Sequence, residues 1–492
     1  MASPIIGIDL GTTNCAVSKY ERGKATILPI NGYKTTPSAL YFDGNVCKVG
    51  HDAKKYLSVY PEKCLISTKR KMGTDYKYNI NGKEVTPVFA ATLLLKYLKE
   101  ETEKYLNEVC NDVVITVPAY FGFAEREATK QAALNAGWNL IGLLEEPTAA
   151  AIAYGQNRGR NSLITVIDLG GGTFDVTVLE HIVENERMIY RVLAVDGNQE
   201  LGGDDFDDAI VEFMIKEGAN GYQSKLELKD EAEKAKIALS QSDVVEISCR
   251  YVETTLDRST YKSLINDYLE EICDTITKTI KKAGKTLEDI DRFVLVGGSC
   301  KHPIVKEAVK KCVGRDPFIS DNMDTSVAEG ATLYHHMRNG VDLIPMTVDT
   351  LLTKTLGTDL QTAEGVINVV LAREGSRIPC KIAHLAYFGG DTLHTRVLQG
   401  DAHFMSDCKE LYEMVVPMKF EDDYTHKIIT IFDIDDSMCL SFYTYEIQED
   451  VDCSDIVNIA DKNGKFDYNV WDEFLKKLPV SSYNHMVHKF TV

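Results

Sequence analysis

The chain has 492 residues, 44% hydrophobic and 26% charged, a composition typical of a globular protein with roughly two to four domains. Its formal net charge of −20 excludes nonspecific binding to nucleic acid or to an anionic membrane surface, because both would repel it. The twelve cysteines form no Cys-x-x-Cys pair, which argues against zinc and for reduced thiols. Because we find no signal-peptide pattern and no apolar run of membrane-spanning length, we expect a cytoplasmic protein.

Strand-like and helix-like patterns alternate over the first 340 residues and predict an α/β domain. Strands are expected at 4–8, at 112–118 and, as a pair, within 163–179. Helices are expected at 123–136 and 226–242, followed by one long amphipathic helix at 260–283. Apolar residues recur at helical spacing along that last helix, and core packing accounts for them: Leu264, Tyr268, Ile272, Ile276 and Ile280.

The pattern changes after residue 340. Residues 341–348 are apolar but contain Pro345, which predicts a linker that docks onto a surface and is not helical throughout. Beyond it, five strands separated by Gly, Asp and Ser turns predict a small antiparallel β unit at 349–450; the strands are 366–371, 382–388, 394–399, 428–434 and 441–447. A short tail, 451–492, holds one expected helix at 470–478.

One short motif occurs twice, with Asp9 and Asp168 each ending an apolar strand just before a glycine turn that carries threonine. Such a carboxylate can order a hydrated Mg²⁺, while glycine N–H groups and threonine hydroxyls can donate to phosphate oxygens. The copies lie 159 positions apart, which predicts two similar lobes facing each other across a cleft. A single copy would be an ordinary turn, but the repetition favours nucleotide binding. Neither copy fits the P-loop or the dinucleotide-binding fingerprint.

Five motifs, in this order, resemble those of the 70-kDa heat-shock chaperone family: 7–14 (GIDLGTTN), 117–121 (VPAYF), 146–155 (EPTAAAIAYG), 168–175 (DLGGGTFD) and 295–299 (LVGGS). The resemblance is strong over 4–340 and weaker over 341–450. It implies an α/β two-lobed actin-like ATPase domain at 1–340 and an interdomain linker at 341–348. It further implies an antiparallel β-sandwich resembling a peptide-binding domain at 349–450, and a tail with a truncated lid helix at 451–492.

The resemblance also implies roles for individual residues, with ATP or ADP, Mg²⁺ and K⁺ as cofactors. Asp9, Asp168 and Asp175 would act on Mg²⁺ and the attacking water, and the catalytic set would be completed by Lys69, Glu146 and Thr173. Nucleotide contacts would come from Gly11, Thr12, Thr13, Asn14, Gly170, Gly171, Gly172, Thr173, Gly202, Gly203, Glu233, Lys236, Ser240, Gly297, Gly298, Ser299, Lys301 and Asp324. Without the resemblance, Lys69 belongs to a charge run of the kind that usually forms a solvated surface.

Several positions depart from the family pattern. Ile237 stands where the family has an arginine stacked on adenine, and Lys301 stands where it has another arginine. Because isoleucine packs without a cation–π contact, nucleotide binding should persist but weaken by roughly 1 kcal/mol.

Other departures affect coupling to partners. Gly142 and Glu145 replace an Arg and an Asn on the surface that J-domain co-chaperones use, and Pro345 and Thr347 alter the linker. Ala386 and Thr395 stand near positions that line the family's apolar peptide groove, along a strand expected at 385–395 that is shorter than the family's. Coupling to a J-domain partner and peptide binding by the β unit therefore both stay open.

Three functions fit these observations. The first is an ATP-dependent chaperone for protein folding under stress, which binds unfolded or extended polypeptide segments and works with a J-domain co-chaperone and a nucleotide-exchange factor. The second is an ATPase-type co-chaperone or docking partner, whose β unit is a docking module without strong peptide retention. The third, a small-molecule kinase of the same fold, fits least well, because a linker and a β unit follow the ATPase domain.

Overall fold

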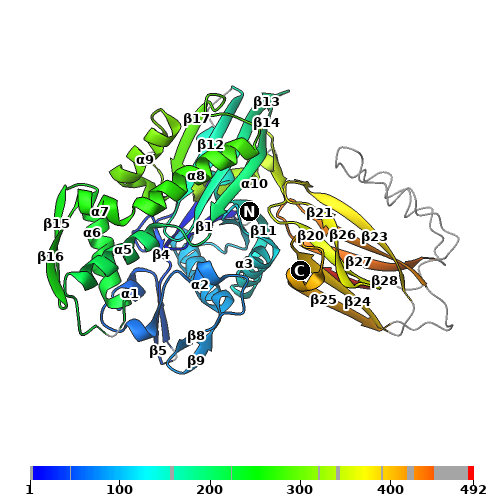
Figure 1. The fold of residues 1–492 in the computed structure, drawn as a ribbon, viewed down its shortest axis with the longest axis horizontal. Coiled ribbons are helices and arrows are strands. Elements are labelled where there is room, and N and C mark those ends of the chain that lie inside the picture. The colour runs from blue at the N-terminus through cyan, green and yellow to red at the C-terminus, as the bar shows by residue number, and fades with distance from the viewer. Residues whose placement is uncertain are drawn as a thin grey trace. The chain divides into compact units, whose positions relative to one another are not determined.

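The computed structural model describes residues 4–44, 46–155, 160–222, 224–319, 322–339, 344–388, 392–417, 426–447 and 486–491. It divides into two compact units, one of Met1–Phe121 with Ala128–Val348 and one of Gly122–Glu127 with Asp349–Val492 (Figure 1). The helix predicted at 470–478 and linker residues 341–343 lie outside the described residues. Within the described ranges, no helix is both long and apolar enough to cross a membrane.

Two sheets with the same strand order form the centre of the first unit. The first sheet has the order β11 (Asn139–Glu145), β10 (Asp112–Val117), β1 (Ile6–Leu10), β2 (Asn14–Glu21), β3 (Lys24–Ile27). The second begins with the matching order β18 (Phe318–Ile319), β17 (Arg292–Val296), β12 (Ser162–Leu169), β13 (Phe174–Glu184), β14 (Arg187–Asn198). In both, the central strand pairs in parallel on one side and forms an antiparallel hairpin on the other. This repeat is the pair of similar lobes that the doubled motif predicts.

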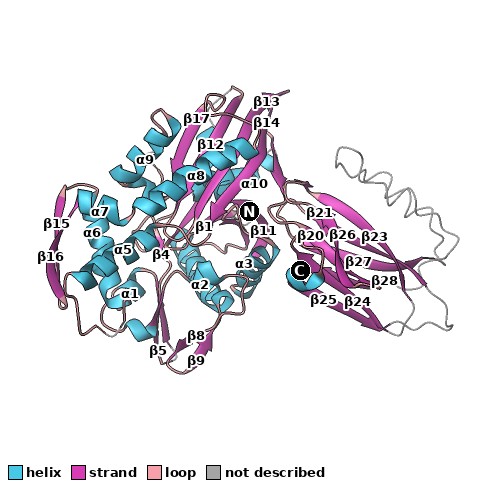
Figure 2. Cartoon of the chain, in the orientation of Figure 1, coloured by secondary structure: helices cyan, strands magenta, loops and turns pink. Residues whose placement is uncertain are grey.

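Helices cover these sheets (Figure 2). In the first lobe, defined as residues 4–121, 128–155 and 322–339, α4 (Glu146–Gly155) and α10 (Ser326–Arg338) share a core with strands of both sheets. In the second lobe, residues 160–319, a larger core joins its sheet to five helices. These are α5 (Gly203–Lys216), α6 (Leu226–Leu239), α7 (Arg258–Leu264), α8 (Asn266–Lys282) and α9 (Pro303–Val313). The other α-helices are α1 (His51–Lys54), α2 (Pro87–Leu106) and α3 (Phe123–Asn135).

The single long helix expected at 260–283 is wrong, because the chain forms two helices, α7 and α8, that meet at Ile265. The Asp257 carboxylate accepts hydrogen bonds from the N–H groups of Ser259 and Thr260 and so caps the start of α7. At Ile265 the backbone leaves helical geometry, with φ −107° and ψ 9°, while its side chain is fully buried. No glycine or proline marks this break, so the sequence carries no stop signal for it.

Short elements complete the first unit. They are β4 (Thr36–Pro37), β5 (Leu40–Asp43), β6 (Val46–Val49), β7 (Cys64–Leu65), β8 (Tyr78–Ile80), β9 (Lys83–Val85), β15 (Val244–Cys249), β16 (Val252–Asp257) and the 3₁₀ turns η1 (Pro61–Lys63), η2 (Thr68–Lys71) and η3 (Gly298–Lys301). The end of the linker runs beside β14. The Met188 N–H donates to the Pro345 carbonyl at 2.9 Å, and Met346, the first residue of β19 (Met346–Leu351), is buried in a core with Met188.

The second unit contains two four-stranded antiparallel sheets. One has the order β21 (Gly365–Ala372), β20 (Leu356–Thr362), β24 (Thr392–Gln399), β25 (Lys409–Pro417), and the other β23 (Cys380–Phe388), β26 (His426–Ile434), β27 (Leu440–Ile447), β28 (Met486–Thr491). Leu356, Val397 and Met414 of the first sheet share a core with Phe432 and Phe442 of the second. Short elements are β22 (Arg377–Ile378) and η4 (Met405–Asp407).

All five strands predicted in this unit are present, while β20, β25 and β28 were missed; β28 lies in the tail, where only a helix was expected. A single strand at 385–395 is wrong, because β23 ends at Phe388, β24 begins at Thr392, and the two belong to different sheets.

Candidate nucleotide site

A cavity of about 360 Å³ in the first unit is lined by both glycine turns of the doubled motif. Seventeen predicted site residues line it: Asp9, Gly11, Thr12, Thr13, Asn14, Glu146, Asp168, Gly170, Gly171, Thr173, Glu233, Lys236, Gly297, Gly298, Ser299, Lys301 and Asp324. Six further residues line it as well: Thr35, Asp204, Asp207, Ile237, Met323 and Val327. The structure therefore brings together most of a site that is scattered over more than 300 positions of sequence.

Strand geometry places the acidic residues of this site. Asp9 lies near the end of β1, which continues through the first glycine turn into β2. Asp168 lies at the same position of the second sheet, near the end of β12, and pairs directly with Asp175 on β13. Because the two hairpins occupy equivalent places in their sheets, their turns lie at equivalent ends and both reach the cavity.

The two turns approach each other so closely that one position needs glycine. A Cβ built on Gly171 would lie 1.6 Å from Thr13 Oγ1, which belongs to the other turn. Gly297 has a second reason to be glycine, since its φ is +86° and a Cβ there would lie 2.3 Å from the Leu169 carbonyl oxygen. Thr13 Oγ1 is buried and forms no hydrogen bond with any described residue. This buried hydroxyl at the edge of the cavity can therefore donate a hydrogen bond to a phosphate oxygen.

The buried carboxyl groups next to the turns have raised pKa values. Burial, followed by the nearby charge of Glu146, raises the pKa of Asp9 to about 7 and that of Asp175 to about 8. The same two causes, together with Asp175, raise the pKa of Asp168 well above its usual value. A cation placed among these groups would favour their ionised forms. Among the residues that the structure describes, however, no three His, Cys, Asp or Glu side chains form a direct ligand set for a metal.

Lys69 is buried within this acidic cluster and does not lie on a solvated surface, as its charge run alone would suggest. Its Nζ lies 2.6 Å from Glu146 Oε1 and 2.5 Å from the Leu10 carbonyl oxygen. The side chain does not line the main cavity but lies behind Gly11 and Thr12, beside a void of about 10 Å³. Lys69 thus contacts both the strand that leads into the first glycine turn and the start of α4.

The comparison with protein families agrees with this geometry. A family model described as "Hsp70 protein" matches residues 5–81 and 74–452. The chain belongs to the Hsp70 family. Members of this family are ATP-dependent chaperones that use Mg²⁺ and act on unfolded polypeptides together with co-chaperones. The mixed sheets of the first unit fit the family's two-lobed actin-like ATPase fold.

Six predicted site residues of this Hsp70 protein do not line the main cavity: Lys69, Gly172, Asp175, Gly202, Gly203 and Ser240. Two of them contact other residues in or next to the site. The Gly203 carbonyl accepts a hydrogen bond from Lys236 Nζ at 2.9 Å, and the Asp175 carboxylate accepts one from the Tyr120 N–H at 3.2 Å. Ser240 differs, because its hydroxyl donates to the Ile237 carbonyl at 2.6 Å within its own helix end.

The two lysines predicted to contact the nucleotide, Lys236 and Lys301, already have acidic partners in this Hsp70. Lys236 Nζ lies 2.7 Å from Asp207 Oδ1, and Lys301 forms an ion pair with Asp324. Ser299 Oγ donates to the Gly170 carbonyl at 2.8 Å, which ties the turn before η3 to the second glycine turn. Ile237 is 58% exposed although it contributes to the lining, so it offers a ligand an open apolar surface.

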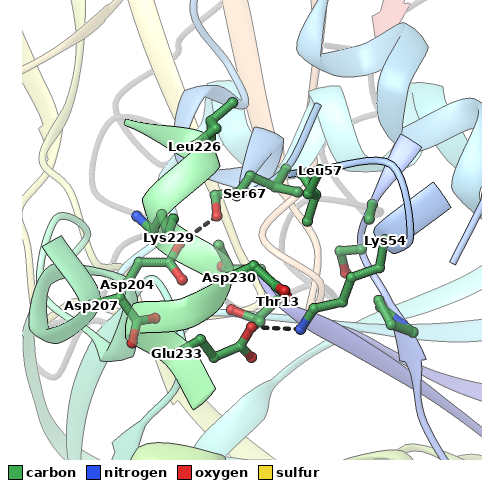
Figure 3. Close-up of a pocket in the computed structure, with 15 residues that line it drawn as sticks. Thr13, Lys54, Leu57, Ser67, Asp204, Asp207, Leu226, Lys229, Asp230 and Glu233 are labelled. Atoms are coloured by element: carbon green, nitrogen blue, oxygen red, sulfur yellow. Dashed lines mark hydrogen bonds and ion pairs between the residues drawn. The ribbon is translucent and has the colours of Figure 1, made fainter. Parts of the chain in front are cut away.

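Contacts between the two lobes close one side of the site, and sequence reasoning missed them. Figure 3 shows two of these contacts at a smaller pocket of about 40 Å³ that shares Thr13, Asp204, Asp207 and Glu233 with the main cavity. Lys54 Nζ lies 2.6 Å from Glu233 Oε2, and the Ser67 hydroxyl donates to Asp204.

A third contact comes from Arg70, whose Nε donates to the Gly172 carbonyl at 2.9 Å and whose Nη1 donates to Asp205 Oδ1 at 3.1 Å. The only sequence signal for these contacts was the acidic pair Asp204–Asp205 directly after two glycines, which is typical of a helix start.

Two of the positions that depart from the family pattern, Glu145 and Gly142, lie in β11. Glu145, at the end of β11, is only 4% exposed, so its carboxyl is not presented for a partner to bind. Gly142 lies within the same strand, opposite Val114 of β10.

Proposed function

We propose that this Hsp70 protein binds and hydrolyses ATP in the 360 Å³ cavity and uses the bound nucleotide to gate the binding of extended apolar polypeptide segments. The observation that carries the ATPase part is the joint cradle made by the two glycine turns. It combines a buried unpaired hydroxyl on Thr13 with buried carboxyl groups of raised pKa. A phosphate chain with a bound cation would satisfy both, since the phosphate accepts from the hydroxyl and the cation neutralises the carboxylates.

Mg²⁺ fits these residues through its water shell. In our proposal Asp9, Asp168 and Asp175 accept hydrogen bonds from water on the ion, which agrees with the lack of a direct ligand set in the described part of the chain. When bound, the ion supplies charge neutralisation at the phosphates. The carboxylate of Asp175 is held by the Tyr120 N–H, and Thr116 donates to Asp9 at 3.1 Å, so the protein fixes the direction of both acceptors.

Lys69 is the group we propose to orient the attacking water and to contact the transferred phosphate. Its present partners, Glu146 and the Leu10 carbonyl, hold the ammonium next to the first glycine turn without placing it in the cavity. A γ-phosphate would compete with Glu146 for this cation. Because Glu146 is the first residue of α4, such competition would report the nucleotide state to that helix.

A Lys69→Ala variant tests this role. Single-turnover hydrolysis should slow at least 100-fold, because phosphoryl transfer depends on positioned charge, while nucleotide affinity should change less than about fivefold. Lys71→Ala is the matched control, since Lys71 lies in the same 3₁₀ turn but is 42% exposed in its side chain and faces Glu200 at 3.4 Å. Equal hydrolysis by wild type and Lys69→Ala would remove Lys69 from the mechanism.

For the second unit we propose a β-sandwich that holds polypeptide in an apolar groove. Its two four-stranded sheets with a shared core support this, and the family match extends to residue 452, well beyond the ATPase unit. The same extent of the match weighs against a small-molecule kinase. Thr395, near a position expected to line the groove, is 8% exposed, so it offers little surface to a ligand.

A fluorescent apolar heptapeptide distinguishes a chaperone from an ATPase with a docking module. The chaperone should bind the peptide saturably, and ATP should weaken this binding. Absence of binding in every nucleotide state, with ATP hydrolysis retained, would favour the docking module instead.

A further inference from the structure

Two cysteines of the second lobe approach each other where α8 and α9 pack together. Cys273 lies in the middle of α8, and Cys312 is the second-last residue of α9. Cys273 Sγ lies 3.8 Å from the Ala308 carbonyl oxygen, and Cys312 Sγ lies 3.7 Å from the Cys273 carbonyl oxygen. Since Ala308 is one helical turn before Cys312, each thiol reaches the backbone beside the other.

The two thiols shift each other's ionisation. The neighbouring Cys312 thiol lowers the pKa of Cys273, with a smaller contribution from Lys311, and Cys273 in turn raises the pKa of Cys312. Both side chains are only partly buried, so a small oxidant can reach them. Because the thiolate is the reactive form, Cys273 is the sulfur that reacts first.

Cysteines near the nucleotide cavity have the opposite character. Cys15 and Cys300 are buried, and burial raises the pKa of each to about 12. Neither forms an appreciable thiolate at neutral pH, so neither competes for an oxidant. The contrast separates Cys273 from these two thiols.

We propose that Cys273 and Cys312 form a reversible disulfide when the protein meets hydrogen peroxide. The Cys273 thiolate attacks one peroxide oxygen and breaks the O–O bond, which yields a sulfenic acid and hydroxide. The sulfur of Cys312 then attacks the sulfenic sulfur, and the hydroxyl group leaves with the Cys312 proton as water. The hydroxide takes the proton that Cys273 lost on ionisation, so two thiols and one peroxide give one disulfide and two waters. A small dithiol reverses the reaction.

The crosslink would restrain a segment that belongs to the nucleotide site. The chain between the two cysteines contains β17 and η3, and η3 carries Ser299 and Lys301 of the cavity lining directly before α9 begins. Closing this loop limits the unfolded chain and therefore stabilises the folded lobe.

The test uses the full-length protein, treated with equimolar hydrogen peroxide, alkylated with iodoacetamide, digested with trypsin and analysed by mass spectrometry without reduction. The expected product joins residues 263–278 to residues 312–315 and disappears on reduction. The thermal midpoint of the oxidised protein should rise by about 4 °C or more, because a disulfide that closes a loop as long as residues 273–312 gives one of the larger stabilising effects.

Two variants complete the experiment. Cys312→Ser should show neither the crosslink nor the rise, whereas Cys249→Ser, which removes another partly buried thiol of the same lobe, should show both. Crosslinking is first scored on the unmodified chain, so the result does not depend on a variant that folds. Alkylation of both cysteines after peroxide, a sulfinic acid at Cys273, a disulfide to another cysteine, or a crosslink that fails to raise the midpoint would each overturn the proposal.

Discussion

Replacing Gly171 with alanine tests whether the two glycine turns act as one site. The new Cβ would lie 1.6 Å from Thr13 Oγ1 and 2.6 Å from Thr13 Cβ, so the turns must move apart. Forcing extra volume into a packed contact costs about 1–3 kcal/mol. This cost destabilises the arrangement in which both turns donate hydrogen bonds to the same phosphate chain. At about 1.4 kcal/mol per tenfold, we expect nucleotide affinity to fall by about 5- to 150-fold.

The assay is a titration with a fluorescent ADP analogue and Mg²⁺, with thermal unfolding to confirm that each variant folds. Gly170→Ala is the matched control in the same turn, because a Cβ there would lie 3.5 Å from the Thr173 carbonyl oxygen, an ordinary contact. We expect it to lose less than about threefold in affinity. Equal losses in the two variants would refute the argument, since they would show that closeness to Thr13 does not matter.

Three further predictions concern charge and exposure at the same site. Lys54→Ala should speed release of ADP by roughly two- to fivefold, because the partly exposed ion pair of Lys54 with Glu233 stabilises closure of the lobes by about 0.5–1 kcal/mol. Lys55→Ala is the stopped-flow control, because its partner Asp52 lies in the same segment of the first lobe. Ile237→Arg should tighten nucleotide binding by roughly fivefold in calorimetry if a cation–π contact forms, and no gain would contradict it. The pKa of Asp9 is raised to about 7, so between about pH 4 and pH 7 the folded protein binds more protons than the unfolded chain. The free energy of unfolding should therefore decrease as the pH rises through this range. Mg²⁺·ADP favours the ionised form and should raise the thermal midpoint more at pH 8 than at pH 6; equal shifts would count against it.

The parts of the fold that follow from local pattern were predictable. The strands that carry the doubled motif could be located because each is an apolar run ended by Asp and glycine, as β1 and β12 show. The break between α7 and α8 could not, because the apolar spacing runs through Ile265 and only tertiary burial of that side chain explains the bend. In the second unit, β20 and β25 were missed because glycine and charged residues dilute their strand pattern.

The same distinction applies to the site. Residues in the glycine turns could be assigned to the phosphates because turn geometry and chemistry depend on neighbours in sequence. Lys69 could not be assigned from its own segment, which has the composition of a solvated face. Its burial depends on Glu146, 77 positions away, and on the Leu10 carbonyl, 59 positions away. Only a comparison of whole motifs carried that information.

The contacts between the lobes show most clearly what a local pattern cannot contain. Lys54 and Glu233 are 179 positions apart, Ser67 and Asp204 are 137 apart, and Arg70 and Asp205 are 135 apart. All three acidic partners belong to α5 or α6, while the donors lie within residues 54–70. Because the three contacts join the same two segments, loss of one leaves the other two to hold the lobes together. This is why we expect Lys54→Ala to accelerate nucleotide release severalfold and not to abolish binding.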